Sequence, residues 1–430
     1  MAKLNLSKKT KKHEDDAAKQ EPQKEKIDPS LLIPLPIVDF DEQLGLAVME
    51  DGTFCDFLEI ITKDLRNLSD DQLLFDKMLW EKLFDTYSDD LKIISFSFPA
   101  ETDSQQRYLS HLLDRTENPG YRHFLQMRME ELQGIPRLFL TQSFVLCFFS
   151  KGFADYKDKY INITGSIGKT GHPLIKTISP ARKKAIIRKL CNMIADKLKE
   201  RVLGKKLTEK ELEHINPQFI ESVSPLGGID FTHEKFIQTG GGYEACIYIY
   251  EYPKRVSMHW LTMLLNNDDT IGVVDISSVE PWKVRQNLKR SLEEQNSRYK
   301  TAKTDMEMLD AEIQYAELES MYREIASYGK IMKSIAIRIF VAADTMYEAE
   351  TRVKELMKEL TDFKCAVCLN ETKQDWRNVF LPFQRQQEGI FAREGQPILS
   401  STLAAGNPFH FSSLSDPHGF YLGQTESGGP

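Results

Sequence analysis

Residues 334–370, SIAIRIFVAADTMYEAETRVKELMKELTDFKCAVCLN, change their hydrophobic period twice. The apolar residues of Ser334–Ala342 predict a buried strand. Thr345 and Glu348 have capping-box spacing, so we expect a helix that begins at Thr345 and extends to Leu360. Phe363–Asn370 then returns to the pattern of a strand. The segment therefore predicts a β-α-β unit.

A second unit of the same kind precedes the first. Ala245–Glu251 is predicted to be a strand, Val256–Leu265 a short helix and Thr270–Ile276 another strand. Two β-α-β units in one domain predict a split β-α-β, ferredoxin-like sheet.

The segment between the two units, residues 282–328, contains neither Gly nor Pro. A single helix of this length would be roughly 70 Å long, which exceeds the size of a domain, so we expect an antiparallel helical hairpin. Thr304 and Glu307 have capping-box spacing and are predicted to start its second helix.

The second helix of this hairpin carries an apolar stripe. Met306, Leu309 and Ile313 are spaced as one helical face. Such a face either packs on its own domain or docks a partner, and periodicity does not separate these alternatives. The three residues are therefore candidates for partner docking.

The N-terminal part of the chain also alternates strands and helices. Asp51-Gly52 predicts a turn in a β-hairpin, and Ser69 with Gln72 predicts the start of a helix. The remaining predicted elements are a strand at Leu91–Phe98, a helical region at Ser104–Leu132, a strand at Leu138–Phe149, and a helix from Pro180 that ends at Gly204.

These patterns predict an α+β protein with two mixed α/β domains. Residues 1–29 form a charged tail that we expect to be disordered, because it has almost no apolar side chains. Residues 30–210 form the first domain, and residues 211–395 form the ferredoxin-like second domain with its helical insertion at about 282–328. Residues 396–430 are expected to be a linker that leads to a further domain.

The composition limits the class of protein. Of the 430 residues 41% are hydrophobic and 28% are charged, which is typical of soluble globular domains. The net charge of −8 argues against a dedicated duplex-DNA-binding protein. Phe144–Phe149 is much shorter than the roughly 20 apolar residues of a membrane span, and the polar N-terminus has no signal-peptide core. We therefore expect a cytoplasmic protein.

Two motifs resemble sites without having the required spacing. Thr164–Thr170, TGSIGKT, has two rather than four residues between its glycines, so we expect a surface loop and no phosphate-binding loop. Cys365 and Cys368 lie three positions apart in a predicted strand, where their side chains face opposite ways. We expect core cysteines and no metal site. Histidine pairs and serine motifs typical of hydrolases do not occur either.

Aromatic residues on one predicted strand leave a nucleic-acid-binding role open. Cys246, Tyr248, Tyr250 and Tyr252 are expected to share one face, and tyrosines on such a sheet can stack unpaired bases. Tyr248 and Tyr250 are the candidates for base stacking. The acidic neighbours Glu244 and Glu251 oppose this interpretation, and structural packing is the alternative.

Five segments together resemble one known family. They are Asp51–Ile60, Leu91–Pro99 (LKIISFSFP), Val379–Pro382 (VFLP), Leu399–Phe409 (LSSTLAAGNPF) and Gly419–Pro430 (GFYLGQTESGGP). Their order and spacing resemble the region before the ATPase core of conjugation motor ATPases of the TrbE, TraC and CagE type, the fourth VirB component of type IV secretion machines. The resemblance covers about residues 35–430 and is nearest to conjugative elements of Gram-positive bacteria.

The resemblance implies a scaffold role in conjugative transfer. In the family, ATP and Mg²⁺ are held by Walker A and Walker B motifs of a RecA-like C-terminal domain, and neither motif occurs in residues 1–430. No catalytic, cofactor-binding or metal-binding residue is therefore carried over to this chain. The implied partners are membrane-embedded channel subunits, further copies in a hexamer and the coupling ATPase, at the inner face of the cell membrane.

Two other classes of function stay open. One is a self-contained module that binds single-stranded nucleic acid through Tyr248 and Tyr250. The other is a small-molecule enzyme, which would require a pocket with perturbed titrating groups.

Overall fold

The computed structural model describes residues 34–63, 68–99, 103–138, 140–168, 171, 173–193, 215–225, 227–253, 256–267, 270–407 and 409. The predicted tail, residues 1–29, lies outside them, as do residues 194–214 and 410–430. The described residues form an α+β fold, as the sequence predicts, built on one 13-stranded sheet in which neighbouring strands are antiparallel.

The first half of the chain supplies six strands and the helices between them. The strands are β1 (Ile37–Asp41), β2 (Leu46–Met49), β3 (Phe54–Ile60), β4 (Leu91–Pro99), β5 (Leu140–Ser150) and β6 (Ile175–Thr177). The helices are α1 (Asp70–Thr86), α2 (Asp103–Arg115), α3 (Pro119–Leu138), α4 (Phe153–Ile167), α5 (Pro180–Cys191) and α7 (Pro217–Val223).

The second half supplies the remaining elements. Its strands are β7 (Ile229–Asp230), β8 (Phe236–Thr239), β9 (Gly242–Glu251), β10 (Thr270–Ser278), β11 (Met332–Ala343), β12 (Lys364–Val367) and β13 (Gln396–Leu399). Its helices are α8 (Thr262–Leu265), α9 (Pro281–Thr301), α10 (Asp305–Tyr328), α11 (Met346–Glu359), α12 (Thr372–Asn378), α13 (Phe383–Gln386) and α14 (Ser400–Ala405).

The two halves repeat one topology. In the second half the strand order β12-β9-β11-β10 is that of a ferredoxin-like sheet, which confirms the predicted split β-α-β arrangement. In the first half β6-β3-β5-β4 has the same order. Each half begins with a hairpin that pairs with its first ferredoxin-like strand, β2 with β3 and β8 with β9. Each also carries two helices between its second and third strands. The fold is therefore an internal structural repeat, which the sequence pattern did not reveal.

One strand pair joins the repeats. β4 pairs with β10 from Leu91 opposite Ile276 to Phe96 opposite Ile271, so the two predicted domains share a single sheet. The division predicted near residue 210 falls between the repeats, although α7 still packs on α5 and β1 of the first half. Residues 396–409, predicted as the start of a linker, belong to this body, because β13 pairs with β11 and α14 packs against α1.

Helices cover both faces of the sheet. α1, α4, α8 and α11 bury apolar side chains on one face, where Trp80, Phe144 and Phe409 form a ring cluster. α5, α7 and α12 cover the other face. No helix of the described residues has the length and apolarity needed to cross a membrane.

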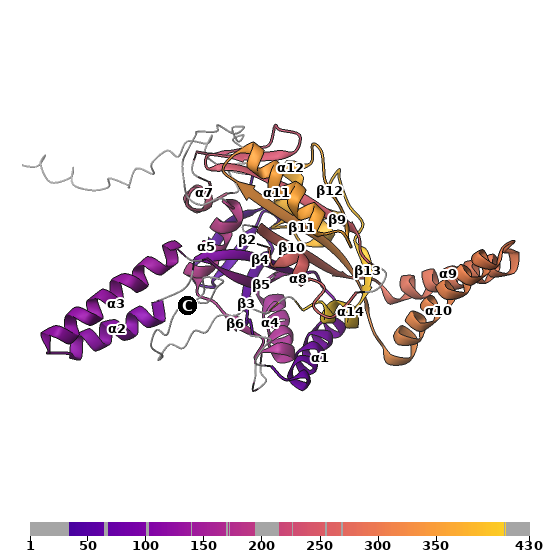
Figure 1. Ribbon diagram of the computed structural model, residues 1–430, viewed down its shortest axis with the longest axis horizontal. Helices are drawn as coiled ribbons and strands as arrows, with labels where there is room; N and C mark the ends of the chain where they lie inside the picture. Colours follow the sequence, from indigo (N-terminus) through magenta and orange to yellow (C-terminus); the bar gives the residue numbers. More distant parts are fainter. Residues whose placement is uncertain are drawn as a thin grey trace, which may run out of the picture.

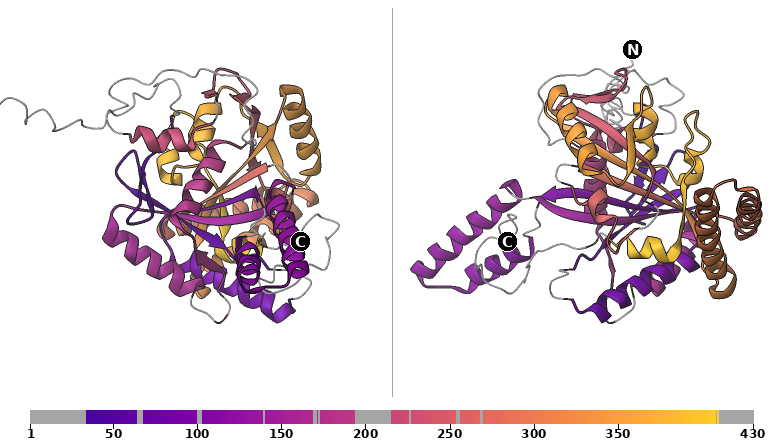
Figure 2. Two further views of the ribbon diagram at one scale, coloured as in Figure 1. Left: turned by 90° about the vertical axis from the view of Figure 1, so that its left-hand side faces the viewer. Right: turned by 45° about the vertical axis from the view of Figure 1, so that its right-hand side comes forward.

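The two helical insertions project from the body at opposite ends of its long axis (Figure 1). Figure 2 shows the same body in two rotated views. The α2–α3 hairpin follows β4, and the α9–α10 hairpin follows β10. β4 and β10 are antiparallel neighbours, so their C-terminal ends point in opposite directions. The seam between the repeats therefore determines where the hairpins emerge.

Most local predictions agree with the structure. Ser69 and Gln72 form a capping box at α1, and the hydroxyl of Thr304 accepts from the backbone N–H of Glu307 at the start of α10. Thr345 caps α11 in the same way. Gly52 has φ +79° in the turn between β2 and β3, a conformation that favours glycine.

The predicted helical region Ser104–Leu132 is confirmed and consists of two helices, because α2 ends at Arg115 and Pro119 opens α3. Three other local predictions are wrong. The helix from Pro180 ends at Cys191, and Gly204 lies outside the described residues. Val256–Leu265 is helical only in its last turn, α8. Thr164–Ile167, expected in a loop, lies in α4, whose spacing of Tyr156, Tyr160, Ile163 and Ile167 was overlooked.

Glu244 of β9 provides a test of core electrostatics. Burial raises the pKa of this carboxyl from 4.5 to about 8, and the backbone N–H of Met193 and the charge of Lys189 offset only part of that effect. The folded state therefore keeps a proton that the unfolded state loses near pH 4.5. The contribution of Glu244 to stability is therefore fully present below pH 4.5 and declines as the pH rises to about 8, by about 3 kcal/mol at pH 7.

Glu244→Gln should remove this decline, because the amide does not titrate. Urea unfolding between pH 5 and pH 8 measures the effect in both proteins. An equally steep decline in the Gln variant would show that other groups cause the pH dependence.

Candidate functional site

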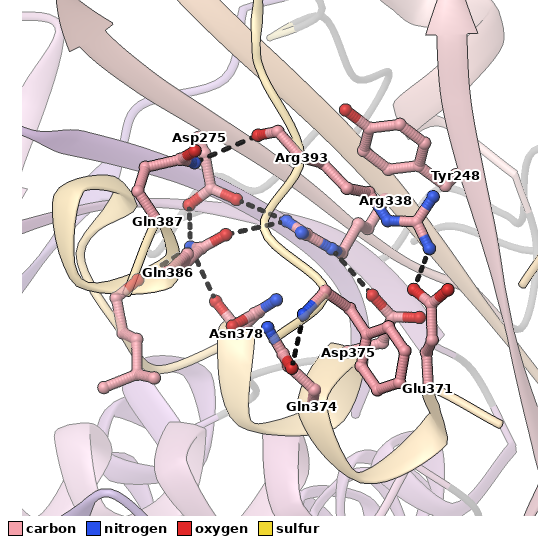
Figure 3. Close-up of polar contacts among 12 residues, drawn as sticks. Tyr248, Asp275, Arg338, Glu371, Gln374, Asp375, Asn378, Gln386, Gln387 and Arg393 are labelled. Atoms are coloured by element: carbon pink, nitrogen blue, oxygen red, sulfur yellow. Dashed lines mark hydrogen bonds and ion pairs between the residues drawn. The ribbon is translucent and has the colours of Figure 1, made fainter. Parts of the chain in front are cut away.

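A buried charge network lies at the seam between the repeats. Lys92 of β4, Asp275 of β10 and Arg338 of β11 come from three adjacent strands, and each is at most 2% exposed. The side chains of Asp275 and Arg338 point to the face that α12 and α13 cover (Figure 3), and Lys92 contacts the end of α12 on the same face. Lys92 is paired with one carboxylate oxygen of Asp275, and the guanidinium of Arg338 donates to the other over 2.9 Å.

The segment α12–α13 completes the network. Asp375 of α12 accepts from Nε of Arg338 at 3.2 Å, and Oε1 of Gln386 in α13 accepts from Nη1 at 3.0 Å. The amide of Gln386 donates to Asp275 at 3.0 Å. Lys92 donates to the carbonyl of Asn378 at 2.7 Å, so backbone groups at the end of α12 are also bound to the seam.

A second ion pair lies beside this network. Arg393 is paired with Glu371, and its guanidinium carbon lies 4.6 Å from the ring centre of Tyr248. The guanidinium carbon of Arg338 lies 5.5 Å from the same ring. Both distances are within the range of cation–π contacts. Figure 3 shows Tyr248 close to both arginines.

The charges of the network balance. Lys92 and Arg338 are matched by Asp275 and Asp375, and Arg393 is matched by Glu371. Burial acts to lower the pKa of Arg338, but Asp275 and Asp375 outweigh it and hold that pKa above its ordinary value. Such a neutral and largely satisfied network holds elements together rather than presenting a reactive group. The network therefore has a structural role.

Three side chains near the network have the donor atoms of a cation site. Sγ of Cys368 and carboxylate oxygens of Glu371 and Asp375 lie within 4.8 Å of one another. Both carboxylates are already paired with guanidinium groups, which would repel a divalent cation. We therefore assign no metal ligands here. As predicted, the two cysteines face opposite ways, since Cys365 packs in the cluster under α11 and Cys368 beside Phe383.

The candidate base-stacking residues are not equivalent. Tyr248 is only 4% exposed, so a base could reach it only if the covering segment moved. Tyr250 is 45% exposed, and stacking stays a prediction for this residue. Tyr252 does not share their face as expected: it follows the end of β9 and packs against Trp260 and Phe363 in the other core.

The candidate docking residues lie on the projecting hairpin. Met306, Leu309 and Ile313 of α10 are 73%, 52% and 47% exposed, so they do not pack on the body. Only the base of the hairpin packs there, through Val284, Leu288 and Ile325 against Met332 and Leu399. The predicted hairpin is confirmed, and docking stays a prediction.

The α2–α3 hairpin carries a comparable surface that the sequence reading missed. Tyr121, Phe124 and Met127 of α3 are all exposed and lie on one helical face. Arg128 lies over the ring of Phe124 at 5.4 Å. The spacing of three residues is visible in the sequence, but the pattern does not show that this helical region projects from the body.

The motif at Thr164 lies at the wrong end of a helix for phosphate binding. Gly168 is the C-cap of α4, where backbone carbonyls rather than N–H groups point outward. Lys169 and Thr170 lie outside the described residues. The described part of the motif therefore does not fit a phosphate loop.

Comparison with known proteins gives one relationship. No family model matches the chain. An uncharacterized protein of Bacillus anthracis, pXO2-09, is 34% identical over 230 residues, which is 53% of this chain and 36% of that protein. The chain thus spans about a third of the length of the curated relative it matches. The name of that relative records no activity.

The network should be most sensitive to loss of its central carboxylate. Asp275→Ala would leave Lys92 and Arg338 buried with only part of their compensating charge, so we expect a loss of about 3–5 kcal/mol in the free energy of unfolding.

Glu350→Ala is the matched control, because its ion pair with Lys354 is fully exposed to solvent and should contribute little to stability. Urea unfolding at pH 7 measures both. Similar small losses for the two variants would contradict a structural role of the network.

Proposed function

We propose that this chain is the scaffold and docking half of a conjugation-type motor ATPase of a type IV secretion machine. It contacts membrane-embedded channel subunits and further copies of the motor, while ATP hydrolysis belongs to a separate RecA-like domain. The chain works at the inner face of the cell membrane and is itself non-catalytic. The coupling ATPase is a further partner in this proposal.

One observation carries the proposal: two helical hairpins with exposed apolar side chains extend from opposite ends of one continuous sheet (Figure 1). Single exposed apolar residues are common, but contiguous sets on projecting elements are typical of interaction sites. A body of this shape can contact two partners at once and hold them apart.

The resemblance to conjugation motors also supports the proposal. Asp56–Ile60 lies in β3, Leu91–Pro99 forms β4, and Val379–Pro382 joins α12 to α13 over the charge network. These three segments are therefore central to the body.

Shortening the α9–α10 hairpin should separate folding from assembly. Replacement of residues 292–315 by a short Gly-Ser linker removes Met306, Leu309 and Ile313 but keeps the packed base at Leu288 and Ile325. The variant should unfold at the same temperature as the parent, within a few degrees, because the deleted part does not contact the body.

The same variant should be absent from secretion complexes purified through a channel subunit. Immunoblotting of the purified complex in a conjugating cell measures this. Normal recovery of the shortened chain would remove the hairpin from the assembly.

The α2–α3 hairpin gives an independent test. Replacement of Tyr121, Phe124 and Met127 by Ser should reduce recovery of membrane-embedded channel subunits with this chain by about tenfold or more, because exposed aromatic anchors contribute strongly to interfaces. The double variant Leu74→Ser, Met78→Ser is the control, since these exposed residues lie on α1 of the body. Equal recovery from both variants would contradict the proposed docking role of α3.

A further inference from the structure

The two helices of the α9–α10 hairpin carry opposite charge. α9 contains six Lys or Arg and two Glu, a net charge of +4. α10 contains seven Asp or Glu and one Arg, a net charge of −6. The α2–α3 hairpin shows no such segregation, since α2 has two basic and two acidic residues and α3 has three and two.

The hairpin does not neutralise these charges internally. Its ion pairs are local: Lys289 with Glu293, Arg298 with Glu294, and Arg323 with Glu319, each within one helix. In the described part of the chain, none joins α9 to α10. Exposed basic groups on α9 and exposed acidic groups on α10 are thus left for an external partner.

The charged groups accompany complementary apolar features. On α10, Asp310 and Glu317 lie on the same helical face as Leu309 and Ile313. Arg285 and Lys289 of α9 border a shallow hollow between the two helices, whose lining also includes Gln286 and Leu292 of α9 and Tyr322 of α10. The spacing of Arg285, Lys289 and Leu292 matches that of Met306, Asp310 and Ile313, since successive members are four and then three positions apart.

We propose that this hairpin binds the same hairpin of a second copy of the chain about a two-fold axis, with α9 of each copy against α10 of the other. The apolar stripe of α10 then lies in the hollow beside α9. Asp310 is level with Lys289 and one turn from Arg285, and Glu317 continues the acidic face further along α9.

The geometry of a hairpin makes this contact self-consistent. When two hairpins overlap antiparallel, α9 of one copy runs parallel to α10 of the other, because the helices of one hairpin run in opposite directions. The N-terminal parts of the two helices, residues 285–292 and 306–313, then come together. A two-fold contact forms both complementary pairs at once.

A second copy is favoured over an unrelated basic or acidic helix because both halves of the complementary surface are present on one hairpin. A basic partner would meet only α10, and an acidic partner only α9. The dimer contact assigns a surface to the contact between copies that is part of the proposed function, and its own test needs neither channel subunits nor ATP hydrolysis.

Charge reversal provides a specific test with the full 430-residue chain. The first variant, Arg285→Glu with Lys289→Glu, changes the net charge of α9 from +4 to 0 and places two glutamates against the acidic face of α10. The second, Asp310→Lys with Glu317→Lys, changes the net charge of α10 from −6 to −2 and places two lysines against the basic face of α9. Each variant alone should raise the dimer Kd by about a hundredfold or more, since like charges then face each other at both symmetry-related contacts.

An equal mixture of the two variants should restore the dimer. The new glutamates on α9 of one variant then face the new lysines on α10 of the other, and the two unaltered helices face each other. Light scattering coupled to size-exclusion chromatography measures mass for the parent, each variant and the mixture. We expect a dimer for the parent that weakens at high salt, monomers for the variants and a heterodimer for the mixture. Circular dichroism verifies that each variant is folded.

A photo-crosslinking residue at Ile313 provides a second measurement without charge reversal. It should link to α9 of another copy within residues 285–296. A parent chain that stays monomeric throughout the micromolar range, a mixture that does not dimerise, or crosslinks that avoid α9 would each overturn the proposal.

Discussion

The pairing of β4 with β10, and the buried ion pair between Lys92 and Asp275 that crosses it, fixes the arrangement of the two repeats. Each repeat alone would expose its second strand as a sheet edge, a surface prone to unwanted pairing. Joining the two edges removes both. The register is also specified, because a slip by one residue would move Lys92 or Asp275 out of the network and into the opposite apolar core.

The same seam determines the shape that the proposed function requires. Each helical hairpin is inserted after the second strand of its repeat, and these strands are antiparallel neighbours at the centre of the sheet. The hairpins therefore leave at opposite ends of a body held together by two cores, one on each face. The duplicated unit is thus one body with two separate contact surfaces, one on each hairpin. The charge network keeps α12 and α13 fixed over the seam, where relative motion of the repeats would otherwise begin.

Local elements could be predicted from the sequence wherever a cap or a turn residue marks them. Ser69, Thr304 and Thr345 mark the starts of α1, α10 and α11, and Gly52 marks a hairpin turn. The repeat could not be found in this way, because its equivalent strands share an apolar pattern rather than particular residues. The network was also missed: Lys92 and Asp275 are 183 positions apart, and each alone is a polar residue in a strand. The sequence also did not show which candidate site residues are exposed. Tyr248 is buried, whereas the apolar stripe on α10 is exposed.

If the two repeats form one rigid unit, they must unfold together, so unfolding should be measured separately in each repeat. Of the four tryptophans, Trp80 lies in the first repeat, and Trp260 and Trp376 lie in the second. Fluorine NMR of the chain labelled with fluorotryptophan, recorded through a urea titration, follows each of them. A shared seam predicts one transition with the same midpoint and slope for all three residues. A separate transition for Trp80 would contradict the account, because the repeats would then be independent domains that merely touch.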